Sequence, residues 1–132
     1  MEVSWSAANA RRLQRHALLP AAPSETKPAE IAAAICGAHA QVLSAAELSI
    51  ALRIQECTRV TVRHALWDEH KLIKTYGPRG TVHLLAADDL PIWTAALSAI
   101  PAQSPFPDGV RLTHVQAEEI IAAIGDALAE AE

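Results

Sequence analysis

The fold of this chain is decided by residues 71–85, which read KLIKTYGPRGTVHLL. Side chains alternate between two faces along residues 72–76 and again along residues 81–85, which is the period of a β-strand. Residues 77–80, Gly-Pro-Arg-Gly, separate the two runs and have the composition of a turn. The stretch therefore predicts a β-hairpin.

Helical signals surround this hairpin on both sides. Capping residues and apolar spacing mark four helices before it and two after it. Their predicted starts are the N-cap Ser4 (with a helix to about residue 18), Pro28, the capping box Ser44-x-x-Glu47, the N-cap Thr58, Asp88 or its neighbourhood, and the capping box Thr113-x-x-Gln116.

Helices followed by a two-stranded hairpin occur in the order of a winged helix. The predicted fold class is therefore mostly α with a minor β part: a winged helix-turn-helix domain with a two-stranded β-hairpin wing and flanking helices. In that fold the helix before the hairpin, here residues 59–70, is the usual recognition helix. We assign residues 1–100 to the winged-helix domain and residues 101–132 to a loop and a C-terminal helix. On pattern alone, a small α+β domain without a nucleic-acid role is equally favoured.

Composition and charge restrict the function only loosely. The chain has 132 residues, 51% of them hydrophobic, and 28 are alanine, so we expect one helix-rich globular domain with many small core contacts. Residues 1–82 carry ten Lys/Arg and seven Asp/Glu (+3), whereas residues 83–132 carry one and eight (−7). The first part permits contact with phosphate, while the overall charge of −4 argues against nucleic-acid binding.

The sequence also bears on the compartment. Cys36 and Cys57 are too few for a disulfide framework and are typical of a reducing environment. No apolar run approaches the roughly 20 residues that cross a bilayer. The N-terminal residues lack the apolar segment of a secretory signal. We therefore expect a cytoplasmic protein with no membrane partner.

Three segments resemble those of one protein family. Residues 79–90 read RGTVHLLAADDL, residues 37–41 read GAHAQ, and residues 12–18 read RLQRHAL. Together they resemble, in the same order, the AlkZ-like and YcaQ-like family of bacterial winged-helix DNA glycosylases. The resemblance implies duplex DNA with alkylated purines as the partner, hydrolysis of the N-glycosidic bond, and the unhooking of crosslinks.

The chain departs from that family in two respects. Its catalytic segment reads His39-Ala40-Gln41, which resembles a histidine-containing variant of the Gln-hydrophobic-Gln triplet of the AlkZ type. Family members are also much longer, with three winged-helix units. We therefore expect a fragment, a truncated product or a divergent single-domain relative, in which residues 101–132 link to a second winged-helix unit.

The resemblance implies that His39 and Gln41 are catalytic. In an extended segment the two side chains point the same way, because the side-chain period is two. The carbonyl oxygen of Gln41 can orient a water molecule, and the neutral imidazole of His39 can accept its proton. The alternative is that His39 is a polar residue bonded at a helix C-terminus.

Candidate DNA contacts lie on the recognition helix and the wing. Thr58, Arg59 and Arg63 belong to the former, and Arg79 lies at the tip of the hairpin. Each has a structural alternative: a solvated helical face for the first three, and for Arg79 an ion pair with Asp88 or Asp89. His83 is expected to have a structural role.

Other chemistries lack a signature. Cys36-x-x-His39 is a half-site without a second pair, so we expect no metal, and without a phosphate-binding loop we expect no cofactor. Three hypotheses remain: an AlkZ-like glycosylase, a winged-helix module that binds DNA without chemistry, and a domain with no nucleic-acid role. The sequence does not determine the oligomeric state.

Overall fold

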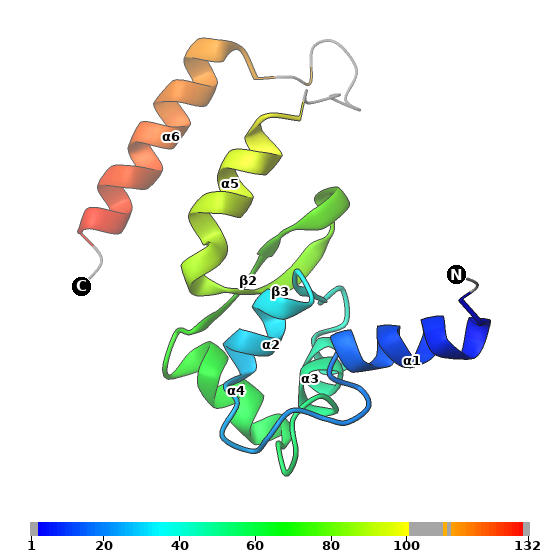
Figure 1. Cartoon of the computed structure of the whole chain (residues 1–132). Coiled ribbons are helices and arrows are strands. Elements are labelled where there is room, and N and C mark those ends of the chain that lie inside the picture. Colours follow the sequence, from blue (N-terminus) through cyan, green and yellow to red (C-terminus); the bar gives the residue numbers. More distant parts are fainter. Residues whose placement is uncertain (1–2, 101–109, 111, 131–132) are drawn as a thin grey trace. The chain divides into compact units, whose positions relative to one another are not determined.

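The computed structural model describes residues 3–100, 110 and 112–130. The chain divides into two units, Met1–Ile100 and Pro101–Glu132. The loop predicted within residues 101–109 lies outside the described residues. Figure 1 shows the elements in chain order: α1 (Trp5–Arg15), α2 (Pro28–Ala34), β1 (Ala38–His39), α3 (Leu43–Ala51), α4 (Arg59–Trp67), β2 (Leu72–Tyr76), η1 (Pro78–Gly80), β3 (Val82–Ala86), η2 (Ala87–Asp89), α5 (Leu90–Ser98) and α6 (His114–Ala129).

The predicted hairpin is present. Strands β2 and β3 pair antiparallel, from Leu72 opposite Ala86 to Tyr76 opposite Val82. Their connection contains the single 3₁₀ turn η1, in which Arg79 adopts the left-handed conformation at φ 60°. The recognition helix predicted over residues 59–70 is α4, and it ends three residues earlier, at Trp67.

A third strand completes the sheet, so the prediction of a two-stranded wing was incomplete. β1 pairs antiparallel with β3, and the strand order is β1-β3-β2. Ala38 lies opposite Leu84, and His39 lies opposite His83. Two residues are too few to show a strand period in the sequence, and their pairing depends on a partner more than 40 positions away.

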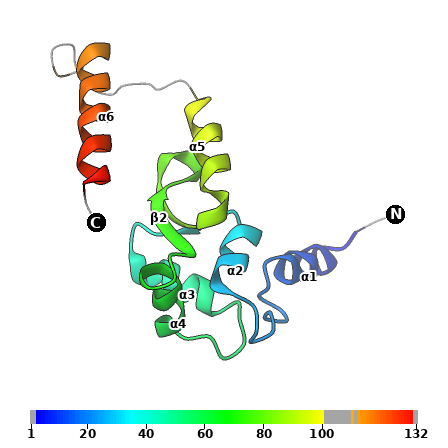
Figure 2. The same cartoon turned by 90° about the vertical axis from the view of Figure 1, so that its left-hand side faces the viewer.

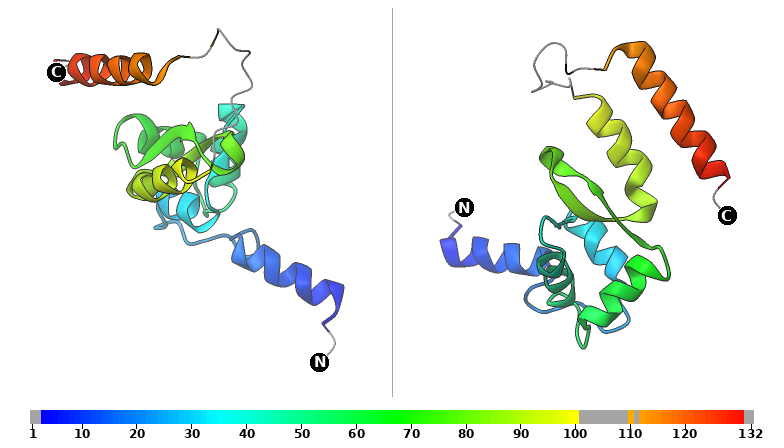
Figure 3. Two further views of the ribbon diagram at one scale, coloured as in Figure 1. Left: turned by 90° about the horizontal axis from the view of Figure 1, so that it is seen from above. Right: turned by 180° about the vertical axis from the view of Figure 1, so that it is seen from behind.

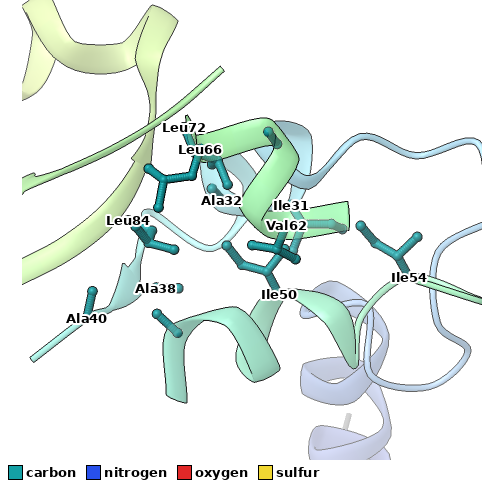
Figure 4. Packing of buried hydrophobic residues seen from close by; sticks show 12 residues of the cluster. Ile31, Ala32, Ala38, Ala40, Ile50, Ile54, Val62, Leu66, Leu72 and Leu84 are labelled. Atoms are coloured by element: carbon teal, nitrogen blue, oxygen red, sulfur yellow. The ribbon is translucent and has the colours of Figure 1, made fainter. Parts of the chain in front are cut away.

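Helices α2, α3 and α4 lie side by side next to the sheet, whereas α1 projects from them (Figures 2 and 3). Their facing sides, together with residues of the strands, form the core seen in Figure 4. Alanines pack there among larger aliphatic residues, which agrees with the many small core contacts that the composition predicted. The buried cluster comprises Ile31, Ala32, Ala38, Ala40, Ala46, Ile50, Ile54, Val62, Ala65, Leu66, Leu72 and Leu84.

Most predicted helix starts are confirmed. The Ser4 hydroxyl accepts a hydrogen bond from the Ala7 amide, and Pro28 begins α2. Thr58 forms a capping box with Thr61 at the start of α4. In the second unit, Thr113 and Gln116 form the predicted box at the start of α6.

The capping box predicted at Ser44 and Glu47 is wrong. Helix α3 starts at Leu43, its N-cap is Val42, and no side chain caps it. The Glu47 carboxylate instead contacts Arg59 and Arg63 of α4. A buried carboxylate is more strongly stabilised by two guanidinium groups than by one backbone amide, so the tertiary contact overrides the local motif.

Candidate functional site

His39 and Gln41 lie at the end of the edge strand β1. Ala38 and Ala40 are buried, whereas His39 and Gln41 are exposed. The Ala40 amide donates to the Val82 carbonyl at 2.7 Å, so pairing with β3 continues past the end of β1. His39 is therefore part of the sheet, whereas Gln41 lies in the bend that follows it. His39 thus lies in a strand, and the alternative of a helix C-terminus is wrong.

The C-terminal end of helix α2 leads directly into the segment that contains His39. The Gly37 amide donates to the Ala32 carbonyl at 2.7 Å, and the Cys36 amide donates to the Ala33 carbonyl at 3.0 Å. These two bonds form a Schellman motif, in which Cys36 adopts φ 58°. Gly37 follows at φ 95°, where a Cβ atom would lie 2.5 Å from Leu85 Cδ2. The close approach explains why glycine precedes the His-Ala-Gln segment.

His83 is the site residue whose position the sequence did not reveal. It is buried, and its Nδ1 lies 2.7 Å from the Thr81 carbonyl oxygen. A carbonyl can only accept, so Nδ1 carries the proton and donates. The His83 ring meets the His39 ring edge to face, with centroids 5.4 Å apart at 77°. The expected structural role of His83 therefore includes support of His39, set by the β1–β3 register.

Gly77 packs on the other side of that imidazole. A Cβ atom at Gly77 would lie 3.1 Å from His83 Nδ1 and 3.2 Å from its Cγ. The ring is thus confined between the hairpin turn and His39. Only the long-range strand pairing brings these groups together, so no local pattern could have predicted the contact.

The predicted DNA contacts on α4 form a charged cluster with Glu47, which is 0% exposed. Arg59 Nε donates to Glu47 Oε2 at 2.5 Å, and Arg63 Nε donates to Glu47 Oε1 at 2.7 Å. Burial opposes ionisation of Glu47, but the hydrogen bonds and charges of Arg63 and Arg59 outweigh it and hold the pKa of this carboxyl below its usual value. Arg59 and Arg63 thus lie on one face of α4, where their side chains are partly exposed and also pair with Glu47.

Thr58 and Arg79 have simpler surroundings. The Thr58 side chain caps α4, so its hydroxyl already bonds within the first turn. Arg79 is exposed at the hairpin turn and forms no ion pair with Asp88 or Asp89, all three being described residues. The alternative that paired Arg79 with either aspartate is therefore wrong.

Neither a metal site nor a membrane-spanning helix is found among the described residues. No three His, Cys, Asp or Glu side chains gather there as the ligands of a metal ion would. Among the helices in the described ranges, none has the length and apolar character needed to cross a membrane.

Comparisons with known proteins show which family this chain resembles. The family described as DNA glycosylase AlkZ-like matches residues 32–132. An interstrand DNA cross-link repair glycosylase of Streptomyces sahachiroi is 33% identical over an alignment of 118 positions, which covers 78% of this chain and 31% of that protein. The solved structure of Streptomyces sahachiroi DNA glycosylase AlkZ has a TM-score of 0.68 and 29% identity, covering 97% of this chain and 34% of that one.

These likenesses confirm the predicted fold class, mostly α with a winged-helix arrangement. The chain spans about a third of the length of both relatives.

Proposed function

This chain belongs to the AlkZ-like DNA glycosylase family, and from that membership we propose that it binds duplex DNA and takes part in removing alkylated purines. The observation that carries the proposal is the exposure of both His39 and Gln41 at the end of β1, together with the contact of His39 with the buried His83. Since DNA is the proposed substrate, we place the protein in the bacterial cytoplasm. Crosslinked purines are a second proposed substrate, because the Streptomyces relative is a cross-link repair glycosylase.

The proposed reaction is hydrolysis of the bond between sugar C1′ and purine N9. An N7-alkylpurine is cationic, so when the bond breaks its electron pair neutralises the departing base. A strong general acid is then unnecessary, and catalysis depends on positioning a water molecule at C1′. The Gln41 carbonyl orients this water by accepting a hydrogen bond from it, and the Gln41 amide donates to substrate or backbone. The neutral His39 imidazole accepts the proton that water releases on attack.

The support from His83 bears on this step. A catalytic side chain acts efficiently only when its orientation is fixed before substrate binds. The Nδ1 of His83 is held by Thr81, and its ring contacts the His39 ring edge to face, which favours one orientation of His39. Gln41 lies two residues further along and is also exposed.

DNA contacts are proposed at four residues. Thr58 and Arg59 lie at the N-terminal end of α4, where the helix dipole favours a phosphate. Arg63 lies one turn further along the same face, and Arg79 lies at the hairpin turn. Such contacts fix the register of a protein on DNA without reading sequence.

The test measures binding and base release separately. Duplex DNA with one N7-methylguanine is incubated with this chain, and with a chimera in which the chain replaces the matching third of the Streptomyces sahachiroi glycosylase. We expect both to bind DNA and the chimera to release the base. His39→Ala should slow release without changing affinity, because His39 is not a proposed phosphate contact. His39→Gln should retain much of the activity, because it restores the glutamine triplet of the AlkZ type.

A winged-helix module that binds DNA without chemistry is the second candidate. It is favoured by the exposed Arg59 and Arg63 on α4, because phosphate contacts need no catalytic residue. DNA binding by the chain together with no release by either the chain or the chimera would establish this candidate. Absence of DNA binding in low salt would rule out both.

A further inference from the structure

The cluster of Glu47, Arg59 and Arg63 has an unusual arrangement. Its acidic member is 0% exposed, whereas the side chains of Arg59 and Arg63 are 58% and 46% exposed. Both arginines contact the carboxylate through Nε, at 2.5 and 2.7 Å. The negative charge is thus covered and the two positive charges face solvent, with a net charge of +1 for the three side chains.

Because Arg59 and Arg63 bind Glu47 through Nε, their other guanidinium donors remain available for a ligand. A guanidinium group has five N–H donors, one on Nε and four on the two Nη atoms. Among the described residues, the Nη atoms of Arg59 and Arg63 form no hydrogen bond with the protein. Arg53, just after the end of α3, provides a contrast, because its Nη1 bonds the carbonyl and hydroxyl oxygens of Ser49. The outward Nη pairs of Arg59 and Arg63 suit a tetrahedral anion that accepts several N–H bonds.

We propose that Glu47 is a positioning residue that holds Arg59 and Arg63 as a two-arginine site for one phosphate group of duplex DNA. This inference rests on the proposed function and extends it by assigning a role to a residue that does not touch DNA. Glu47 fixes the two side chains through their Nε atoms, so less conformational entropy is lost when a phosphate binds.

A control for net charge is available nearby. Glu56 is an exposed glutamate in the connection between α3 and α4, outside this cluster. Glu47→Gln and Glu56→Gln remove the same negative charge with nearly the same change of shape. If net charge alone governs binding, both variants bind DNA more tightly than wild type.

The experiment measures the affinity of the full chain for an undamaged DNA duplex by fluorescence anisotropy over a salt series. Circular dichroism first establishes that each variant is folded at the assay temperature. We expect Glu56→Gln to bind at least as tightly as wild type. Glu47→Gln should bind more weakly despite its gain in net charge, and its slope of log K against log salt should be shallower by about 1, as for the loss of one phosphate contact.

Arg63→Lys keeps the test decisive if Glu47→Gln does not fold. Lysine retains the charge and can still pair with Glu47, but it lacks the second set of donors that would face a phosphate. We expect weaker binding from this variant at unchanged net charge. Wild-type affinity in Arg63→Lys, or Glu47→Gln binding as tightly as Glu56→Gln, would show that the cluster only joins α3 to α4. If the wild-type chain itself does not bind DNA, the proposed function is overturned as well.

Discussion

Gly37→Ala tests whether the turn that leads into the candidate site requires a glycine next to the Leu85 side chain. Gly37 has φ 95°, and a Cβ atom there would lie 2.5 Å from Leu85 Cδ2 and 3.4 Å from the Leu84 carbonyl. A residue with a side chain in the left-handed region costs about 1–2 kcal/mol. Forcing a methyl group against the buried Leu85 costs about 1–3 kcal/mol more. We therefore expect the variant to lose about 2–5 kcal/mol of unfolding free energy.

Gly80→Ala is the matched control. Gly80 also has a positive φ, 66°, but nothing lies within 4 Å of a Cβ atom there. Only the conformational cost of about 1–2 kcal/mol remains. Urea unfolding followed by circular dichroism measures both variants at 25 °C. A loss in Gly37→Ala no greater than that in Gly80→Ala would refute the argument, because it would show that Leu85 moves aside freely.

Two further predictions concern titratable groups. Because the folded state holds the pKa of Glu47 below its usual value, the unfolded chain takes up this proton first. The contribution of Glu47 is therefore complete above the usual carboxyl pKa and is lost as the pH falls from about 5 towards 3, so unfolding free energy should decline there less steeply in Glu47→Gln than in wild type. Burial raises the pKa of the Cys57 thiol and outweighs its hydrogen bonds to Thr61 and Thr58, whereas Cys36 is exposed. Iodoacetamide at neutral pH should therefore label Cys36 first, as mass spectrometry would show, and faster labelling of Cys57 would contradict this reading.

Local sequence rules correctly predicted those elements that are determined by residues close together in the sequence. The alternating residues on both sides of Gly77 specify the β2–β3 hairpin, and Thr58 caps α4 through its own first turn. The same rules failed at Ser44, because the Glu47 carboxylate is bound by arginines 12 and 16 positions away. A motif is reliable only when nothing distant binds its side chains more strongly.

In the candidate site, too, features set by neighbouring residues were predictable, whereas features set by distant residues were not. The alternating burial of residues 38–41 matches the side-chain period of two on which the prediction for His39 and Gln41 rested. The edge-to-face contact with His83 depends on the register of β1 against β3, which two residues of strand cannot encode. The close approach of Gly37 to Leu85 after the Schellman motif likewise depends on a residue of β3.

The rate of base release in Gln41→Ala tests the central claim most directly. The chimera described above is mixed in excess with duplex DNA containing N7-methylguanine, and free base is measured under single-turnover conditions. We predict that Gln41→Ala loses most of the release rate while its DNA affinity stays within about twofold of the parent, because Gln41 positions water and contacts no phosphate. Release at the parental rate with normal affinity would show that the exposed pair His39 and Gln41 is not the catalytic site.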